Sequence, residues 1–486
     1  MRRRDLVAAG AAVPAMLAGR QITAQPSGAP GDIGILRSAY LALHPGLLRY
    51  NGPRQIAQGF DRLERDWATL DQRGRFLALA RFTAGIRCGH SYPNFYNQSR
   101  AVVDSLFGGK TRLPFAFRWI EGRMVITADH GSGAALAPGT VIRRINGVTA
   151  GEMLKRLMPL VRADGGNDAK RRALLSVLGR ERIETFDVFH GLVFGAPADG
   201  MHLIEFEVPG KPAGRAAVPA IDMKQRLTHM NRSTRAEAPT QPSWKWEMRT
   251  DGIAILTMDS WAMYNAKWDW KGWLDERLDS LSGARGLIVD LRANEGGNDC
   301  GDLILSRIGG KDIIRPRVRR LVRAHAVPAW LNPYLDTWDD SFRDWGDRAV
   351  RVDERFFELD RPETPGVIAA RPRPIAAPVI VLTGPQNSSA TFQFAQLCQA
   401  SGRATLLGEA TGGNRRGING GAYFFVRLPQ SGLECDLPLI GYFPEQPQPD
   451  AGIEPDIHVP VRAADIAAGA DRQMEAAIAR LQSTLP

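Results

Sequence analysis

Residues 379–395 read VIVLTGPQNSSATFQFA. The first four residues, 379–382, are apolar and mostly β-branched, which predicts a buried strand that a Gly-Pro pair then ends. Apolar residues from Phe394 to Cys398 repeat at helical spacing, so Ser389 lies where a strand turns into a helix. Free backbone N–H groups and the positive end of the dipole at a helix start stabilise an oxyanion. Ser389 is therefore a candidate nucleophile, although serine is also an ordinary helix cap.

Composition and charge are ordinary for a folded protein of two or three domains. The chain has 486 residues, of which 44% are hydrophobic and 23% charged, with a formal net charge of +10. The densest basic stretch, RPRVRRLVR at 315–323, lacks the interleaved aromatic residues of a nucleic-acid interface. We interpret it as a solvated face and expect no nucleic-acid partner.

The first 24 residues have the pattern of an export signal. Three arginines at the start precede an apolar stretch at 6–17, and the small residue Ala24 suits signal peptidase. The Arg-Arg pair followed by Leu-Val resembles a bacterial twin-arginine signal. No other run approaches 18 apolar residues, so we expect a periplasmic or secreted protein with no integral membrane span after signal removal. A retained N-terminal anchor is the alternative.

The cysteines do not form a recognisable scaffold. Cys88, Cys300, Cys398 and Cys435 are dispersed, and no CxxC spacing suggests a metal site. We expect no metal and no cofactor. In an oxidising compartment three complete disulfide pairings are open, and so are free thiols.

Hydrophobic periodicity divides the chain into regions with different expected structure. Apolar residues repeat at helical spacing near the N-terminus, alternate in short β-like runs after it, and then follow the strand–helix alternation of an α/β unit. The expected order is an export signal at 1–24, a helical region at 33–108, a small β-rich module at 111–161, a loosely assigned connecting region at 162–245, an α/β core at 246–462 with an insertion at about 310–375, and a C-terminal helix within 463–486.

Two further strands are expected to end in Gly-Gly turns. They lie in GLIVDLRANEGGN at 286–298 and RATLLGEATGGN at 403–414. Glycines there let backbone N–H groups approach a substrate closely. A third segment, RCGHSY at 87–92, places His90 just after a predicted helix.

Together these segments resemble the S41 family of tail-specific, or C-terminal-processing, serine peptidases. The resemblance implies a ClpP/crotonase-like α/β core with an N-terminal helical region and a small PDZ-like β-rich module. Any small β-domain is the alternative for that module. The motifs that carry the resemblance are LAPGTVIRRINGVTAGEMLKRL at 136–157, DLRANEGG at 290–297, NSSAT at 387–391, GRATLLGEATGG at 402–413 and GIEPDIHV at 452–459.

The family uses two catalytic bases, and the sequence favours one. In the Ser-Lys branch the lysine would occupy the position of Asn414, and no lysine follows Lys311. The Ser-His branch, similar to the tricorn-type peptidases, takes its base from the N-terminal helical region, where His90 matches. Neutral imidazole is well suited to deprotonate a serine. His44, which precedes a proline, is adequately explained by a turn.

The resemblance also implies the remaining groups of the site. The backbone N–H groups of Gly296 or Gly297 and of Ala390 would form the oxyanion hole. A carboxylate shortly before the closing motif would orient the base. Glu445 and Asp450 are both candidates for that carboxylate.

The leading hypothesis is a serine endopeptidase that cleaves extracytoplasmic peptides or proteins through Ser389 and His90. A non-catalytic peptide or hydrophobic-ligand binding protein on the same fold is the alternative, and it would need neither residue. An enzyme based on Cys88 or Cys300 is disfavoured, because neither lies at a clear strand-to-helix junction with a base nearby in the sequence. No feature of the sequence predicts the oligomeric state.

Overall fold

A computed structural model describes residues 30–229, 240–360 and 366–483. The export signal predicted at 1–24 lies outside these residues. Within them, no helix is long and apolar enough to cross a membrane, and no group of three or more His, Cys, Asp or Glu is placed to hold a metal ion. All four cysteines are buried free thiols.

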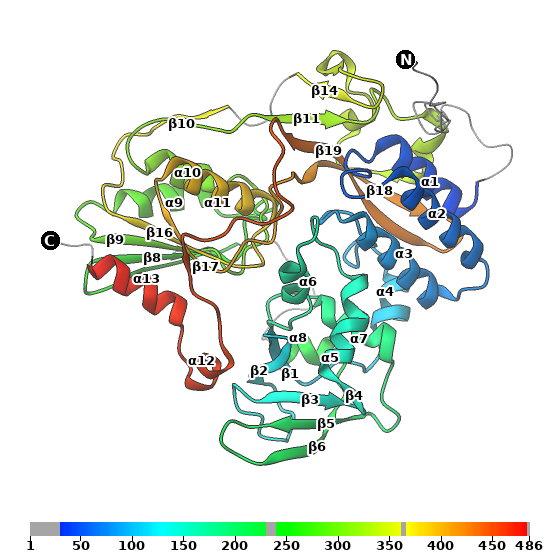
Figure 1. The fold of residues 1–486 in the computed structure, drawn as a ribbon, viewed down its shortest axis with the longest axis horizontal. Helices are drawn as coiled ribbons and strands as arrows, with labels where there is room; N and C mark the ends of the chain where they lie inside the picture. Colours follow the sequence, from blue (N-terminus) through cyan, green and yellow to red (C-terminus); the bar gives the residue numbers. More distant parts are fainter. Residues whose placement is uncertain (1–29, 230–239, 361–365, 484–486) are drawn as a thin grey trace, which may run out of the picture.

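The α/β core is a six-stranded sheet between two layers of helices. Its elements are β7 (Lys245–Met248), β8 (Ile253–Thr257), α9 (Trp270–Asp279), β9 (Gly286–Asp290), α10 (Gly301–Arg307), β16 (Val379–Thr383), α11 (Ser389–Ser401), β17 (Thr405–Gly408), β20 (Ile457–His458), α12 (Ala463–Ala468) and α13 (Arg472–Ser483). The strand order is β20-β17-β16-β9-β8-β7, and only the edge pair of β7 and β8 is antiparallel. Helices α9, α10 and α11 cover one face and α13 covers the other (Figure 1).

Helices cover both faces of this sheet, which explains why its strands are continuous apolar runs in the sequence. The structure confirms the core strands and helices expected at 253–258, 271–281, 286–291 and 301–308, with ends that differ by one or two residues. The single tail helix that we expected is two helices, because Gly469 adopts a φ of +64° and ends α12.

The N-terminal helices pack against a second, antiparallel sheet. The helices are α1 (Asp32–Leu43), α2 (Pro53–Trp67), α3 (Gln72–Ile86) and α4 (Arg100–Phe107), and the strands are β11 (Val318–Val322), β12 (Leu335–Asp336), β13 (Ala349–Arg351), β14 (Phe357–Leu359), β18 (Asn419–Leu428) and β19 (Leu433–Pro444). The strand order is β12-β18-β19-β11-β14-β13. Four of these strands come from the expected insertion at 310–375, whose outer ends pair as β10 (Ile313–Ile314) and β15 (Val367–Ile368). The insertion thus joins the core to the helical region.

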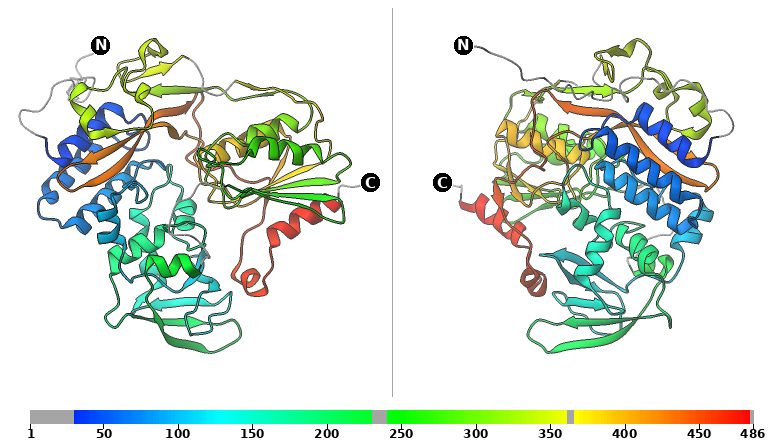
Figure 2. Two further views of the ribbon diagram at one scale, coloured as in Figure 1. Left: turned by 180° about the vertical axis from the view of Figure 1, so that it is seen from behind. Right: turned by 45° about the vertical axis from the view of Figure 1, so that its right-hand side comes forward.

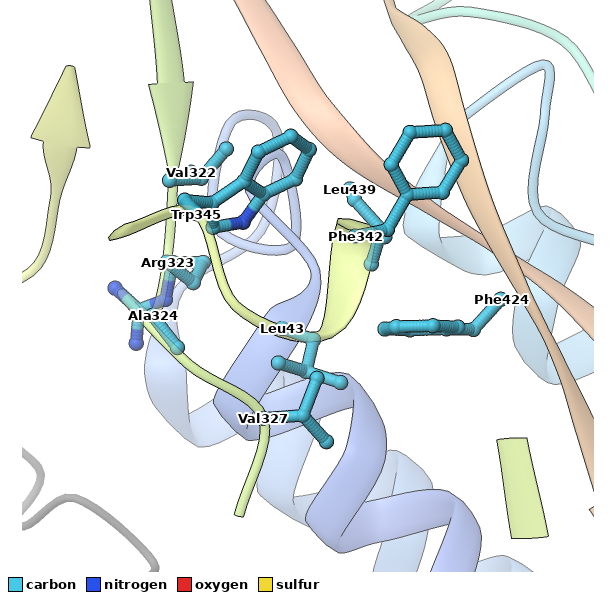
Figure 3. A pocket seen from close by; sticks show the side chains of 9 residues that line it. All are labelled: Leu43, Val322, Arg323, Ala324, Val327, Phe342, Trp345, Phe424 and Leu439. Carbon is cyan, nitrogen blue, oxygen red and sulfur yellow. The ribbon is translucent and has the colours of Figure 1, made fainter. Parts of the chain in front are cut away.

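Apolar side chains fill the joint between α1, the insertion and the β18–β19 hairpin. Figure 3 shows Leu43, Phe342, Trp345 and Phe424 around a cavity of about 10 Å³. This space holds at most about one water molecule, so it is a packing defect and not a ligand site.

A third sheet lies beside the helical region. Its strands are β1 (Phe115–Ile120), β2 (Arg123–Asp129), β3 (Val141–Ile145), β4 (Val148–Thr149), β5 (Met201–Glu207) and β6 (Ala213–Pro219), and the helices of this part are α5 (Ala150–Leu157), α6 (Asp168–Leu174), α7 (Thr185–Phe194) and α8 (Met223–His229). Strands β5 and β6 extend the expected β-rich module with residues from the connecting region. The two views of Figure 2 place this sheet at one end of the molecule, next to the helical region.

Candidate active site

Ser389 is the first residue of α11, at the carboxyl end of β16. It adopts a φ of +51°, in the left-handed region that costs a non-glycine residue about 1–2 kcal/mol. Its side chain is partly exposed and makes no hydrogen bond to any described residue. A strained strand-to-helix turn of this kind presents a nucleophilic serine at the top of an α/β sheet. The predicted junction is therefore confirmed, and the strain is an addition that sequence periodicity does not reveal.

The glycine turn after β9 lies directly against Ser389. Gly296 and Gly297 have φ values of +105° and +136°. A Cβ atom on Gly296 would lie 2.9 Å from Ser389 Cβ and 3.0 Å from the Ala390 nitrogen. Because real Cβ atoms do not approach so closely, only glycine permits this contact. The carboxyl ends of neighbouring parallel strands bring the two turns together, where α/β proteins usually place their sites.

Two buried asparagines hold the turns in register. Asn387 Nδ2 donates to the carbonyl oxygen of Asn294 at 3.0 Å, and the Asn387 carbonyl accepts the N–H groups of Gly412 at 2.7 Å and Gly413 at 3.0 Å. The turn after β9, the turn that carries Ser389 and the turn at Gly412 and Gly413 therefore meet at Asn387. The sequence pattern predicted no role for either asparagine. Asparagine in the turn after a strand is nevertheless a residue that often supports the turn with its side chain.

Of the candidate oxyanion donors, Gly297 and Ala390 have free N–H groups. Gly296 N–H donates to Asn294 Oδ1 at 2.8 Å and is engaged. Among the described residues, the N–H groups of Gly297 and Ala390 have no acceptor. Gly296 thus supplies space beside Ser389, the candidate nucleophile, while Gly297 and Ala390 supply the free N–H groups.

His90 lies in the turn that follows α3. Gly89, just before it, donates its N–H to Asp164 Oδ1 at 2.8 Å, and its carbonyl accepts from Arg162 Nη1 at 2.8 Å. The His90 Nδ1 atom is buried and has no hydrogen-bond partner, and the ring centroid lies 6.0 Å from that of Tyr423. The imidazole is fixed through its backbone neighbours and not through its own nitrogens.

Burial lowers the pKa of His90 below the usual value for histidine. The carboxylate of Asp164 acts in the opposite direction, and the charges of Arg162 and Lys170 lower the pKa further. The imidazole is therefore neutral near pH 7, which is the form that a general base requires.

No hydrogen bond joins Ser389 to His90, although both are described, and an ionic cluster links their segments. Glu295 forms ion pairs with two cations. One of its carboxylate oxygens lies 3.2 Å from Arg162 Nη2, and the other lies 3.0 Å from Lys170 Nζ. Arg162 and Lys170 come from the connecting region at 162–245, which has no periodicity that could have identified them. Glu295 stands in the DLRANEGG motif, so its proximity to the site could have been anticipated.

Comparison with known proteins identifies the family. Residues 252–459, which contain Ser389 and both glycine turns, match peptidase family S41. This part of the chain is a peptidase family S41 domain. The resemblance seen in the sequence motifs is confirmed there, and the family is one of serine peptidases. No curated protein matches the sequence significantly.

Solved structures share the fold of this S41 family member over nearly its whole length. Mature CPAF in complex with lactacystin is 15% identical, covers 93% of this chain and 97% of its own, and has a TM-score of 0.61. Mature CPAF alone is 15% identical at 93% and 96% coverage with a TM-score of 0.59, and a CPAF mutant is 16% identical at 90% and 93% coverage with a TM-score of 0.58. The fold of N-terminal helices, several sheets and an α/β core is thus CPAF-like.

The two candidate orienting acids of the S41 site have different surroundings. Asp450 Oδ1 accepts from Gly166 N–H at 2.9 Å and from Asn414 Nδ2 at 2.7 Å. Glu445 forms an exposed ion pair with Arg317 at 3.5 Å. Neither carboxylate hydrogen-bonds to His90.

Asp164 is an acid that sequence reasoning missed. It is buried, holds Gly89 through its carboxylate, and accepts Asn414 Nδ2 on its carbonyl oxygen at 3.3 Å. Asp450 therefore reaches the His90 segment only indirectly, through Asn414 and Asp164. Asn414, which stands where the Ser-Lys branch has its lysine, is here a fully buried bridge.

Proposed function

We propose that this S41 family member is a serine endopeptidase in which Ser389 is the nucleophile and His90 is the general base. The observation that carries the proposal is the strained Ser389 turn pressed against Gly296, with the N–H groups of Gly297 and Ala390 free beside it. A left-handed serine at a helix start has no structural advantage over a glycine there, which favours a chemical reason for it.

The reaction follows from these groups. His90 removes the hydroxyl proton as Ser389 Oγ attacks the peptide carbonyl, and the N–H groups of Gly297 and Ala390 stabilise the oxyanion that forms. His90 then gives its proton to the leaving amine, which leaves an acyl-serine ester. A water molecule, deprotonated by His90, hydrolyses that ester and restores the serine. The two side chains must come within hydrogen-bond reach of about 3 Å for the first step.

The substrates that we propose are extracytoplasmic peptides or unfolded proteins, with the enzyme in the periplasm or secreted. The export signal expected at 1–24 supports that location. Strands β3 and β4 and helix α5, which contain most of the PDZ-like motif at 136–157, support a peptide-binding module beside a ClpP/crotonase-like core.

A non-catalytic binding protein on the same fold is the second candidate. The lack of a hydrogen bond between Ser389 and His90 favours it, because a carrier needs no such contact. It does not account for the strain at Ser389 or for the close approach of Gly296.

Covalent labelling separates the two candidates. The chain without residues 1–24 is treated with a fluorophosphonate probe and assayed on a quenched fluorescent unfolded protein. We expect labelling and hydrolysis in the wild type, loss of both in Ser389→Ala, and retention of both in the control Ser401→Ala at the far end of α11. Labelling that persists in Ser389→Ala would show that another residue is the nucleophile. No labelling and no hydrolysis in the wild type would favour the carrier.

A further inference from the structure

An ionic cluster of Arg162, Glu295 and Lys170, in which Lys170 is buried and the other two are partly exposed, lies between the two halves of the proposed site. The side chain of Lys170 is 2% exposed, that of Arg162 20% and that of Glu295 38%. Although burial alone would raise the pKa of the Glu295 carboxyl, Lys170 and Arg162 outweigh burial and lower it to about 2. Glu295 is therefore ionised near neutral pH.

Each cation also holds one of the two catalytic segments. Arg162 Nη1 donates to the Gly89 carbonyl, directly before His90. Lys170 Nζ donates to the carbonyl of Gln386 at 2.9 Å, in the turn that leads to Ser389. One carboxylate thus ties the His90 segment to the nucleophile turn.

Glu295 also fixes the turn through its backbone. Its carbonyl oxygen accepts Ser388 Oγ at 3.1 Å, and Gly296, the next residue, lies against Ser389. A displacement of Glu295 would therefore move Gly296, which lies against Ser389, as well as the two cations.

Stability alone is a weak explanation for such a cluster. Removing the charge of Lys170 from water is costly, and apolar replacements of buried ion pairs are often equally stable or more stable. The position of the cluster between His90 and Ser389 offers a more specific reason for its presence.

We propose that Arg162, Glu295 and Lys170 are positioning residues that hold the His90 segment against the Ser389 turn and set the charge around the base. This inference rests on the proposed function, in which His90 is the base. None of the three has to touch the reacting atoms.

The charges of the cluster act on the pKa of His90, so the direction in which this pKa shifts depends on which charge is removed. The other groups near the imidazole are the carboxylate of Asp164 and the ring of Tyr423, and the thiol of Cys88 interacts with the backbone of His90. Against this constant background, loss of the positive charge of Lys170 raises the pKa of His90, and loss of the negative charge of Glu295 lowers it.

The test is the pH profile of kcat/KM for Lys170→Met and Glu295→Gln with the quenched fluorescent substrate. We expect kcat to fall at least about tenfold in both. The acid limb should move to higher pH in Lys170→Met and to lower pH in Glu295→Gln, each by on the order of one unit. The exposed residues Lys155 and Glu152 on α5 provide the controls Lys155→Met and Glu152→Gln, which should match the wild type.

If the two residues had only a structural role, kcat would fall similarly in both variants, but the acid limbs of their pH profiles would not move in opposite directions. Shifts in the same direction, or kcat within twofold of the wild type in both variants, would overturn the inference. If Lys170→Met does not fold, Lys170→Arg keeps the charge, and an unmoved acid limb with lowered kcat is then expected; a limb that moves contradicts the proposal.

The proposed function is judged separately, by labelling of Ser389 in the wild type. A wild type that is not labelled defeats the proposed function. A labelled wild type with unshifted profiles defeats only the role of the cluster. Activity that survives His90→Ala but disappears in both Lys170→Met and Lys170→Arg would make Lys170 itself the base.

Discussion

Gly296 and Ser389 touch across two loops that follow neighbouring parallel strands, β9 and β16. The position of a Cβ atom on Gly296 would be 2.9 Å from Ser389 Cβ, 2.8 Å from the Ser388 carbonyl oxygen and 3.0 Å from the Ala390 nitrogen. The positions of Ser389, the proposed nucleophile, and of the Ala390 N–H, a proposed oxyanion donor, therefore both depend on the absence of a side chain at residue 296.

Gly296→Ala should consequently damage catalysis more than stability. The added methyl group must displace Ser389 and the Ala390 N–H, and loss of one oxyanion donor lowers kcat by roughly 10² to 10³. The free energy of unfolding should fall by about 1–3 kcal/mol because alanine is strained at positive φ. The matched control is Gly283→Ala, whose φ is +79° but whose surroundings are open. It should show a stability loss alone, and equal kcat losses in the two variants would contradict the steric argument.

Ser389→Gly should make the protein more stable while abolishing its activity. Glycine adopts a φ of +51° without the cost that serine bears, and Ser389 makes no hydrogen bond that would be lost. We expect the free energy of unfolding to rise by up to about 1 kcal/mol. The gain is limited because the greater freedom of glycine in the unfolded chain offsets part of the strain that is removed. Urea denaturation measures it. A clear loss of stability would mean that the hydroxyl has a structural role that its contacts do not explain.

His90→Ala should reduce kcat by several orders of magnitude if His90 is the base. In the wild type, the acid limb of kcat/KM should lie below about pH 6.5, the ordinary pKa of histidine, because burial lowers the pKa of His90. Activity is lost as the pH falls through this lowered pKa, since the protonated imidazole cannot accept the serine proton. His229→Ala, an exposed change on α8, is the control. An acid limb above pH 7 would be incompatible with a buried histidine base.

Local sequence was sufficient to predict the strand-to-helix junction at Ser389 but not its surroundings. The strand at 379–382 and the Gly-Pro break depend on a few adjacent residues, so the junction at Ser389 was predictable. Arg162 and Lys170 reach the site only because the connecting region folds between the helices and the core, and no periodicity encodes that approach. The pairing of the β18–β19 hairpin with the insertion strand β11 also escaped prediction, because β11 and β19 lie about 120 residues apart in the chain.

The third member of the site was the least predictable part. Two acids near the closing motif were equally acceptable from the sequence, and the contact that distinguishes them passes through Asn414 to a residue 250 positions earlier, Asp164. Such an indirect connection exists only in the folded structure.

Substitution of amides for the three acids should therefore give a graded response. Asp164→Asn should lower kcat most, because its carboxylate holds Gly89 and favours protonated His90. Asp450→Asn should have a smaller effect through Asn414 and Gly166. Glu445→Gln should be close to neutral, because an exposed ion pair contributes about 0–1 kcal/mol. A large loss in Glu445→Gln alone would show that the catalytic state differs from this arrangement. Melting temperatures of all three variants separate misfolding from lost chemistry.

His44 should make the folded state sensitive to acid. It is fully buried, its Nδ1 accepts the Gly46 N–H at 3.1 Å, and its Nε2 lies 2.9 Å from Ser91 Oγ. Burial, helped by the charge of Arg49, lowers the pKa of His44 to about 3. A proton added to Nδ1 would remove its bond with Gly46, so the folded state favours the neutral ring.

The sign of the pH dependence follows from that shift. Between about pH 6.5 and pH 3 the unfolded chain binds a proton at His44 that the folded chain does not, so stability is present at neutral pH and is lost as the pH falls. The loss approaches about 1.4 kcal/mol per pH unit for this one group. Urea denaturation at pH 7, 6 and 5 should show a shallower dependence in His44→Gln than in the wild type, and an unchanged one in the exposed control His229→Gln. Parallel pH profiles for the wild type and His44→Gln would show that His44 is not an acid-sensitive group of the fold.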